Sequence, residues 1–310
     1  MKKIALLGAT GYIGRSLLRE FFDEKDKSQL FLFSRTKSKV HTIVKKYPKD
    51  INFQICEIGE FNKYNYDVII NCTGIKSLNS LKQNPSEVFS ATEEVDSMVI
   101  RYLLKNPKAL YINMSSGAVY GDNFHKSISS KTKSVLDINN IDVSESYAIA
   151  KLNSEAKHRS LSNLNIVDLR VFAFFSRFYD VSPNFMISEI VDCLKSKKVF
   201  KTDDNNIVRD YITPKDLLSL IKKVMKKGKI NDFFDVYSKA PISKLTLLSF
   251  LEKKYGLKYV INKIPKPITG VSKNVYYSKN KKAGTIGYVP EYSSLKGIES
   301  EISKIDNMSK

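Results

Sequence analysis

The residues best able to carry proton chemistry in this 310-residue chain are a tyrosine and a lysine four positions apart, Tyr147 and Lys151. On a helix, side chains at this spacing lie on the same face. A tyrosine with an ordinary pKa of about 10 is a poor acid or base near neutrality, but an adjacent ammonium favours its phenolate. Ser116, which follows an apolar run, could donate a hydrogen bond to the same reacting oxygen. Together these side chains could move a proton to or from a substrate oxygen.

The tyrosine–lysine spacing is weak evidence by itself, because the chain has 17 tyrosines and 51 lysines and arginines. The same spacing begins at five tyrosines: Tyr147, Tyr211, Tyr259, Tyr277 and Tyr292. Tyr147 is favoured because it opens an amphipathic segment, from about Glu145 to Leu161, in the first half of the chain. A half-buried structural tyrosine on that helix is the alternative.

A glycine-rich loop lies near the N-terminus, directly after the apolar run Ile4–Leu7 and at the start of a helical pattern. Gly8 permits a tight turn, Gly11 lets the backbone approach a pyrophosphate, and Gly14 lets the helix pack close to the strand. The helix N-terminus would then face the phosphates with its N–H groups and the positive end of its dipole. The loop therefore predicts a bound dinucleotide, with contacts from Gly8, Thr10, Gly11, Tyr12, Ile13 and Gly14.

The residues after the second apolar run, Leu30–Phe33, indicate which dinucleotide binds. NAD sites usually place an acidic residue here for the ribose 2′-OH. This chain has Ser34, Arg35 and Thr36 instead, and a guanidinium suits a 2′-phosphate that a carboxylate would repel. We therefore predict NADP (NADPH). NAD stays the alternative, because Arg35 could face solvent and stack on adenine with either cofactor.

Short apolar runs and helical patterns alternate through the first half of the chain, which is typical of βαβ units. The pattern predicts an α/β fold with a doubly wound parallel Rossmann sheet and a smaller C-terminal substrate lobe. Residues 1–172 would form the NADP-binding domain, to which 207–237 would return, and 173–206 and 238–310 would form the lobe. The expected strands are Ile4–Leu7, Leu30–Phe33, Ile51–Ile55, Val68–Asn71, Leu110–Met114 and Ile166–Phe172.

The charge and cysteine content limit the possible partners. The net charge is +19, but only eight of the 51 basic residues are arginine and the lysines are spread along the whole chain. Because nucleic-acid binding needs a gathered basic surface, we predict no nucleic-acid partner. No run approaches the ~18 apolar residues of a membrane span, so no membrane partner is expected. Cys56, Cys72 and Cys193 show no paired spacing, which predicts no metal site and a reducing, cytoplasmic location.

The G-x-x-G-x-x-G loop, the run M-S-S-G-A-V-Y-G at 114–121 and the Tyr147–Lys151 pair resemble the extended short-chain dehydrogenase/reductase superfamily, specifically the NAD-dependent epimerase/dehydratase family of nucleotide-sugar enzymes. The resemblance implies catalytic roles for Ser116, Tyr147 and Lys151. It also implies cofactor contacts from Tyr147 and from Lys151, which would hydrogen-bond the nicotinamide ribose. It also implies further cofactor contacts, from Glu57, Ile58, Cys72, Thr73 and Gly74, and substrate contacts, from Ser116, Gly117 and Arg209. For Glu57, a solvated charge is the alternative.

The chain departs from this pattern at two places. Gly117 and Ala118 stand where the dehydratases carry an Asp-Glu pair, which argues against 4,6-dehydration. Ala173 stands where the family has an asparagine that holds the substrate nucleotide. Together, Arg35 and the absent acidic pair predict an NADPH-dependent reductase of a keto group on a nucleotide-linked deoxy sugar.

Two other functions stay open: a nucleotide-sugar epimerase that recycles NAD(P), and a non-enzymatic NADP sensor. By analogy with relatives, the helices near Glu93–Leu104 and Glu145–Leu161 would form a homodimer interface.

Overall fold

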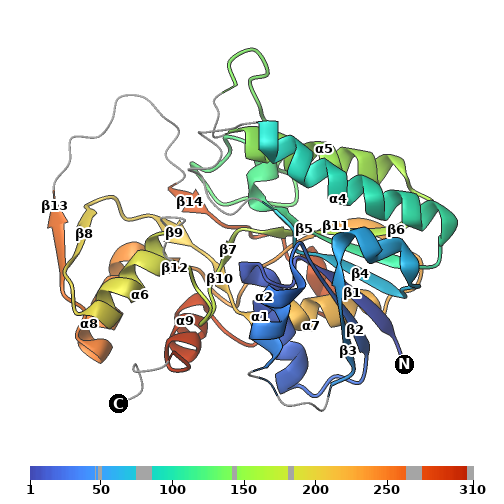
Figure 1. Cartoon of the computed structure of the whole chain (residues 1–310). Coiled ribbons are helices and arrows are strands. Elements are labelled where there is room, and N and C mark those ends of the chain that lie inside the picture. The colour runs from blue at the N-terminus through green and yellow to red at the C-terminus, as the bar shows by residue number, and fades with distance from the viewer. Residues whose placement is uncertain are drawn as a thin grey trace.

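The computed structural model shows two units joined side by side (Figure 1). It describes residues 1–45, 47, 51–74, 86–141, 145–180, 185–262 and 274–305. The larger unit is built on a seven-stranded sheet with the order β11-β6-β5-β4-β1-β2-β3, and every neighbouring pair is parallel. The predicted doubly wound α/β Rossmann sheet is thus confirmed. Its strands are β1 (Lys3–Leu7), β2 (Gln29–Ser34), β3 (Phe53–Glu57), β4 (Val68–Asn71), β5 (Leu110–Ser116), β6 (Asn165–Val171) and β11 (Asn231–Asp235).

The third strand begins later than predicted. Ile51 opens the apolar run, but it lies before β3, and its side chain is buried in the core of the larger unit. It is apolar because of this packing, not because it pairs in the sheet. The fifth strand instead extends beyond the predicted end at Met114 and reaches Ser116.

Helices cover both faces of the sheet (Figure 1). On one face, α1 (Tyr12–Asp23), α2 (Lys37–Val44) and α7 (Pro214–Met225) share a hydrophobic core with the strands. On the other face lie α4 (Ser86–Lys105), α5 (Ser146–Ser160) and the 3₁₀ turn η1 (Ile58–Lys63). The strand order reverses at β1, between β2 and β4, and ligands of such sheets bind outside the carboxyl ends of the strands at this point.

The smaller unit has its own hydrophobic core and more regular helices than the sequence suggested. Its helices are α6 (Met186–Ser196), α8 (Lys244–Tyr255) and α9 (Ser294–Ile302). Its sheets are small, and most of their strands have two residues. They comprise the pair β8 (Phe200–Asp203) and β13 (Tyr259–Asn262), the pair β7 (Ala173–Phe174) and β10 (Tyr211–Ile212), and the trio β12 (Ile242–Ser243), β9 (Val208–Arg209) and β14 (Val275–Tyr276).

The chain passes between the two units several times. Strand β11 and helix α7 join the larger unit after the first part of the smaller one. Ala283, within the 3₁₀ turn η4 (Lys282–Ile286), and Tyr288, just after it, also pack into the core of the larger unit. The domain boundaries drawn from the sequence stay a prediction.

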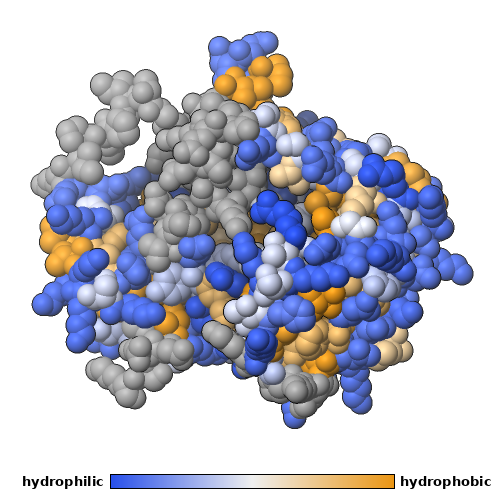
Figure 2. Space-filling model, in the orientation of Figure 1, coloured by the Kyte–Doolittle hydropathy of each residue, from blue (hydrophilic) through white to orange (hydrophobic). Residues whose placement is uncertain are grey.

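Hydrophilic side chains dominate the face of the molecule shown in Figure 2, with apolar residues in scattered patches over both units. One apolar patch lies at the tip of the segment that projects between β5 and α5, where Val135 and Ile138 are exposed. Among the described helices, none is both long and apolar enough to cross a membrane.

Candidate active site

One face of α5 lies along the carboxyl end of β5. Tyr147, Lys151 and Glu155 follow one another at four-residue spacing on this face. Lys151 is buried, and its Nζ donates to the carbonyl of Met114, 2.9 Å away. One turn later, Glu155 accepts a 2.5 Å hydrogen bond from Ser115 Oγ. These two bonds fix α5 against the strand and place Tyr147 beyond the end of β5.

Ser116 is the last residue of β5, and its hydroxyl contacts residues of both units. Its Oγ accepts a hydrogen bond from the Ala118 amide, 3.1 Å away, at the start of the 3₁₀ turn η2 (Gly117–Tyr120). The same Oγ lies 3.3 Å from the hydroxyl of Tyr276 in the smaller unit. Lys151 Nζ is 5.9 Å from the centre of the Tyr147 ring. The predicted catalytic residues therefore stand on adjoining ends of β5 and α5.

Tyr276 lies beside the predicted catalytic residues, and the sequence analysis did not single it out. Burial raises the pKa of its phenol, the hydrogen bond with Ser116 lowers it, and the proximity of Tyr147 raises it. Its ring packs on Phe124, with centroids 4.5 Å apart, and on Phe172. Because Tyr276 lies on a two-residue strand far along the chain, no periodic pattern marks it.

Arg209 pairs in register with Tyr276, on the neighbouring parallel strand. Its guanidinium carbon is 5.7 Å from the centre of the Tyr276 ring, and its Nη1 donates to the Val208 carbonyl. Burial lowers the pKa of this guanidinium, and within the described part of the chain it forms no ion pair with a carboxylate. An anion next to Tyr276 would supply the missing countercharge.

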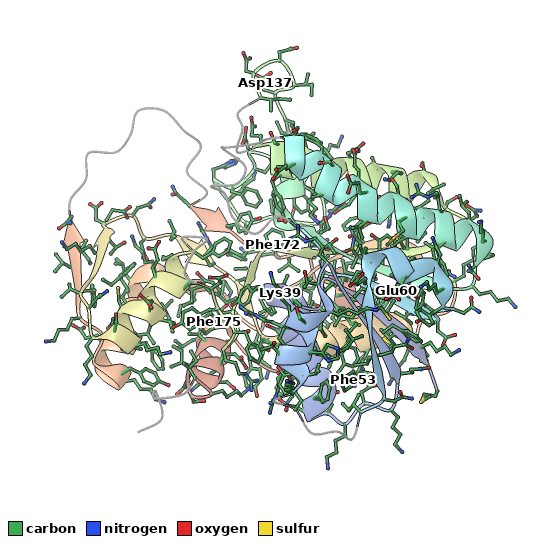
Figure 3. All side chains as sticks on the ribbon, in the orientation of Figure 1. Lys39, Phe53, Glu60, Asp137, Phe172 and Phe175 are labelled. Atoms are coloured by element: carbon green, nitrogen blue, oxygen red, sulfur yellow. The ribbon has the colours of Figure 1, made fainter. Side chains whose placement is uncertain are left out.

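Phe172 occupies the space beside the start of η2, at the centre of the molecule between the two units (Figure 3). A Cβ atom on Gly117 would lie 2.4 Å from the Phe172 ring, so any larger residue there must displace it. Ala118 is buried as well. An acidic pair at 117 and 118 would therefore have no room in this packing. Ala173, next along the chain, begins β7 and packs against the core of the smaller unit.

The glycine loop is closed tightly against the sheet. Gly8 has a φ of +76°, and a Cβ there would lie 3.0 Å from the backbone of Cys72 and Thr73. A Cβ on Gly14 would lie 2.1 Å from the Gly8 carbonyl oxygen. Helix α1 begins after Gly11 with no side-chain cap and no acidic residue in its first turn. The residues present thus fit a dinucleotide pyrophosphate, because bare backbone and an uncapped helix N-terminus meet at one place.

Two of the other loop residues also serve packing. The hydroxyl of Tyr12 accepts a 2.8 Å hydrogen bond from the Ser176 amide, and its ring meets Phe174 edge-on at 5.1 Å. Burial raises the pKa of Tyr12. Ile13 packs against the core of the larger unit, whereas Thr10 is half-buried within the turn.

At the end of β2, Arg35 is exposed and, among the described residues, takes part in no ion pair. The turn beneath it is ordered by Ser34, whose Oγ donates to the Thr36 carbonyl at 2.8 Å and accepts from the Thr36 amide at 3.3 Å. The guanidinium is therefore available at the carboxyl edge of the sheet.

Glu57 pairs in register with Ser34 at the same edge. It also caps η1: its carboxylate accepts from the Glu60 amide, while the Glu60 carboxylate accepts from the Glu57 amide at 2.9 Å. This capping box gives Glu57 a structural use that the sequence analysis did not foresee. Ile58, the first residue of η1, packs into the core below.

The segment after β4 lies directly against the glycine loop. The Cys72 amide donates to the Leu7 carbonyl at 2.9 Å, and Thr73 is held by Asn71, whose Oδ1 accepts from the Thr73 amide at 3.0 Å. Burial raises the pKa of the Cys72 thiol to about 12, so it stays protonated. Gly74 is the last residue described before the gap at 75–85.

A known family and several solved structures share this architecture. The sequence model of the NAD dependent epimerase/dehydratase family matches residues 4–236. No curated protein matches the chain. Among solved structures, UDP-glucose-4-epimerase from Stenotrophomonas maltophila, with bound NAD and formylated UDP-arabinopyranose, has a TM-score of 0.80 and 15% identity, covering 96% of each chain.

Two further structures share the fold. UDP-glucuronic acid 4-epimerase from Bacillus cereus, as a mutant in complex with NAD and UDP-4-deoxy-4-fluoro-glucuronic acid, has a TM-score of 0.77 and 19% identity over 96% of this chain and 97% of that one. dTDP-glucose 4,6-dehydratase from Bacillus anthracis, in complex with NAD, has a TM-score of 0.73 and 16% identity over 97% and 95%. The expectation of an enzyme of the extended short-chain dehydrogenase type is confirmed by the family match, which spans most of the chain. The chain belongs to the NAD-dependent epimerase/dehydratase family.

Proposed function

We propose that the protein is an NADPH-dependent oxidoreductase that reduces a keto group on a nucleotide-linked deoxy sugar. The observation that carries this proposal is the convergence of Ser116, Tyr147 and Lys151 beside Tyr276 and Arg209 of the smaller unit. Ser116, Tyr147 and Lys151 can together protonate a carbonyl oxygen that accepts a hydride, and Arg209 can bind an anion.

The protein residues have separate roles in this reaction. Bound at the carboxyl edge of the sheet, the nicotinamide would supply the hydride. Tyr147 gives its phenolic proton to the substrate oxygen as charge develops there. Ser116 donates a hydrogen bond that orients the same oxygen. Lys151, held in place by the Met114 carbonyl, stabilises the resulting Tyr147 phenolate by charge attraction.

The smaller unit would hold the rest of the substrate. Arg209 is suited to the diphosphate, because a guanidinium binds phosphate oxygens through paired hydrogen bonds. Tyr276 presents a second hydroxyl next to Ser116, where it can contact the sugar ring. A contact from Gly117 to the sugar stays a prediction, since the Phe172 ring fills the space where a side chain of residue 117 would lie. Ala173 supplies no amide for the nucleotide, so other residues must hold the base.

Preference for NADP rests on Arg35. Replacing Arg35 with Gln should weaken NADPH binding about tenfold or more while changing NADH binding little, since a charge-assisted hydrogen bond to the 2′-phosphate is lost. Lys39→Gln on α2 is a matched control for removing one nearby positive charge. If the variant lost affinity equally for NADPH and NADH, or lost none, the alternative role of Arg35 beside the adenine would be favoured.

A second candidate, nucleotide-sugar epimerase, is favoured by the similarity to two 4-epimerases. The two functions differ in cofactor balance: a reductase consumes one NADPH for each product, whereas an epimerase returns its cofactor unchanged. Purified protein should be mixed with NADPH and nucleotide-linked keto sugars, and NADPH oxidation compared with product by mass spectrometry. Isomerisation of a nucleotide sugar without net NADPH oxidation would overturn the reductase in favour of the epimerase.

A non-enzymatic sensor would bind the cofactor but turn over neither class of substrate. The homodimer also stays a proposal, with the outer faces of α4 and α5 as its interface. Light scattering after size exclusion would show twice the chain mass of 35.3 kDa if the dimer forms. The cytoplasmic location and the absence of nucleic-acid and membrane partners stay predictions.

A further inference from the structure

Six buried side chains form a closed ring of hydrogen bonds beneath the candidate cofactor site. The ring joins α4, α5 and three central strands, and none of its members is more than 3% exposed. Its members, in order around the ring, are His158, Asp96, Tyr111, Asn71, Asn113 and Asp168.

His158 is the only member that contacts both carboxylates. Its Nε2 lies 2.7 Å from Asp96 Oδ1, and its Nδ1 lies 2.9 Å from Asp168 Oδ1. Ionised carboxylates only accept hydrogen bonds, so both ring nitrogens of His158 must carry protons. Burial lowers the pKa of His158, but the bonds to Asp168 and Asp96 outweigh it and raise the pKa to about 9.

The charges around His158 come from every side of the ring. Asp96 faces it from α4, Asp168 from β6, and the phenol of Tyr111 from β5. On α5 itself, Lys157 Nζ lies 2.5 Å from Asp96 Oδ2, and Arg159 Nη2 lies 2.9 Å from Asp168 Oδ2. Each carboxylate thus has two cationic partners, and His158 is the partner they share.

Both arms of the ring meet at the side chain of Asn71. Its Nδ2 donates to the Tyr111 hydroxyl at 2.9 Å and to Asn113 Oδ1 at 3.2 Å, which uses both of its N–H groups. The amide oxygen of Asn71 is therefore turned towards Thr73, where it accepts from the amide and from the hydroxyl. The Thr73 backbone in turn lies against Gly8.

We propose that His158 is a positioning residue that holds the Cys72–Thr73 segment against the glycine loop. It acts through Asp96, Asp168 and the rest of the ring as far as Asn71, so that the dinucleotide crevice is formed before the cofactor binds. The inference rests on the proposed function, since it assumes that the dinucleotide binds in a crevice lined by the glycine loop and the Cys72–Thr73 segment. Neutral His158 can donate only one hydrogen bond and leaves one buried carboxylate without its shared partner. The hydrogen bonds from Thr73 to Asn71 should then weaken.

The test compares His158→Gln with the double variant Asp96→Asn/His158→Gln. Glutamine can donate to Asp168 but not also to Asp96, whereas an asparagine introduced at position 96 can donate to the glutamine oxygen and still accept from Tyr111. The double variant therefore restores a closed ring without a titrating group. His41→Gln, at an exposed histidine of α2, is the matched control.

The first readout is hydrogen exchange at the Thr73 amide, which needs no cofactor. We expect protection to fall about tenfold in His158→Gln, to return in the double variant, and to fall in the wild type as pH rises through about 9, after correction for intrinsic exchange. The wild-type titration tests the inference even if His158→Gln fails to fold. Unchanged protection in a folded His158→Gln and in the alkaline wild type would overturn it.

The second readout is the dissociation constant for NADPH and NADH, with kcat where turnover is found. Binding should weaken about tenfold in His158→Gln and recover in the double variant, while kcat at saturating cofactor changes little. If the wild type binds neither dinucleotide, the proposed function fails, and the exchange measurement still decides whether His158 holds Thr73. Wild-type binding by His158→Gln would overturn the link to the cofactor.

Discussion

On one side of the candidate site, Ser116 and Lys151 stand on a seven-residue strand and a fifteen-residue helix, whereas on the other side Arg209 and Tyr276 stand on strands of two residues each. The first side is fixed by buried bonds from α5 to β5. The second depends on the pairing of three segments that are distant in the sequence. We infer that the first side suits a reaction whose geometry must not vary, and the second suits recognition of a particular substrate.

The largest effect expected on the first side follows from Tyr147→Phe. Removing the phenolic proton should lower kcat by about 10²–10⁴-fold, the usual contribution of a general acid or base, and change cofactor affinity far less. Tyr259→Phe is a matched control, because Tyr259 also begins a Tyr-x-x-x-Lys run but lies on β13 of the smaller unit. A fall of kcat under threefold in Tyr147→Phe would show that Tyr147 does not donate the proton to the substrate oxygen.

The next effect concerns the stability of the larger unit at alkaline pH. The pKa of His158 is raised to about 9 from an ordinary value of 6.5, so its contribution is complete below about pH 6.5 and is lost as pH rises through about 9. Such a shift corresponds to about 3 kcal/mol of unfolding free energy. Urea unfolding at pH 6 and pH 10 should show this loss in the wild type but not in Asp96→Asn/His158→Gln. An equal pH dependence in both proteins would contradict it.

A smaller loss of stability is expected from Gly14→Ala. The new Cβ would lie 2.1 Å from the Gly8 carbonyl, and displacing backbone in a packed turn should cost about 2 kcal/mol and weaken dinucleotide binding. Gly59→Ala is the control, since nothing lies within 4 Å of its Cβ position. Thermal unfolding of both variants measures the difference. Equal melting temperatures would mean that the glycine loop is looser than the sheet it contacts.

The same contrast explains which parts of the site could be predicted. Ser116, Tyr147 and Lys151 follow local rules, because a strand end and a helix repeat place them, and the glycine loop follows directly from β1. Tyr276 could not be found this way, because its position depends on pairing β14 with β9. The ring of six hydrogen-bonded side chains could not be predicted for the same reason.

The ring's partners also come from distant segments. Asp96, His158 and Asp168 lie on three different elements, and each alone reads as an ordinary polar residue. The sequence also placed the third strand too early, because Ile51 is apolar for packing and not for pairing.

The smallest expected effect, from Tyr276→Phe, tests the second side most directly. Phenylalanine keeps the packing on Phe124 and Phe172 but loses the hydroxyl that lies 3.3 Å from Ser116 Oγ. If Tyr276 recognises the sugar, KM should rise about fivefold while kcat changes little, since one hydrogen bond contributes about 1 kcal/mol. Tyr277→Phe, the neighbouring residue, should change neither value. A fall in kcat comparable with that of Tyr147→Phe would mean that Tyr276 acts on the reacting oxygen, and that the reaction uses both sides of the site.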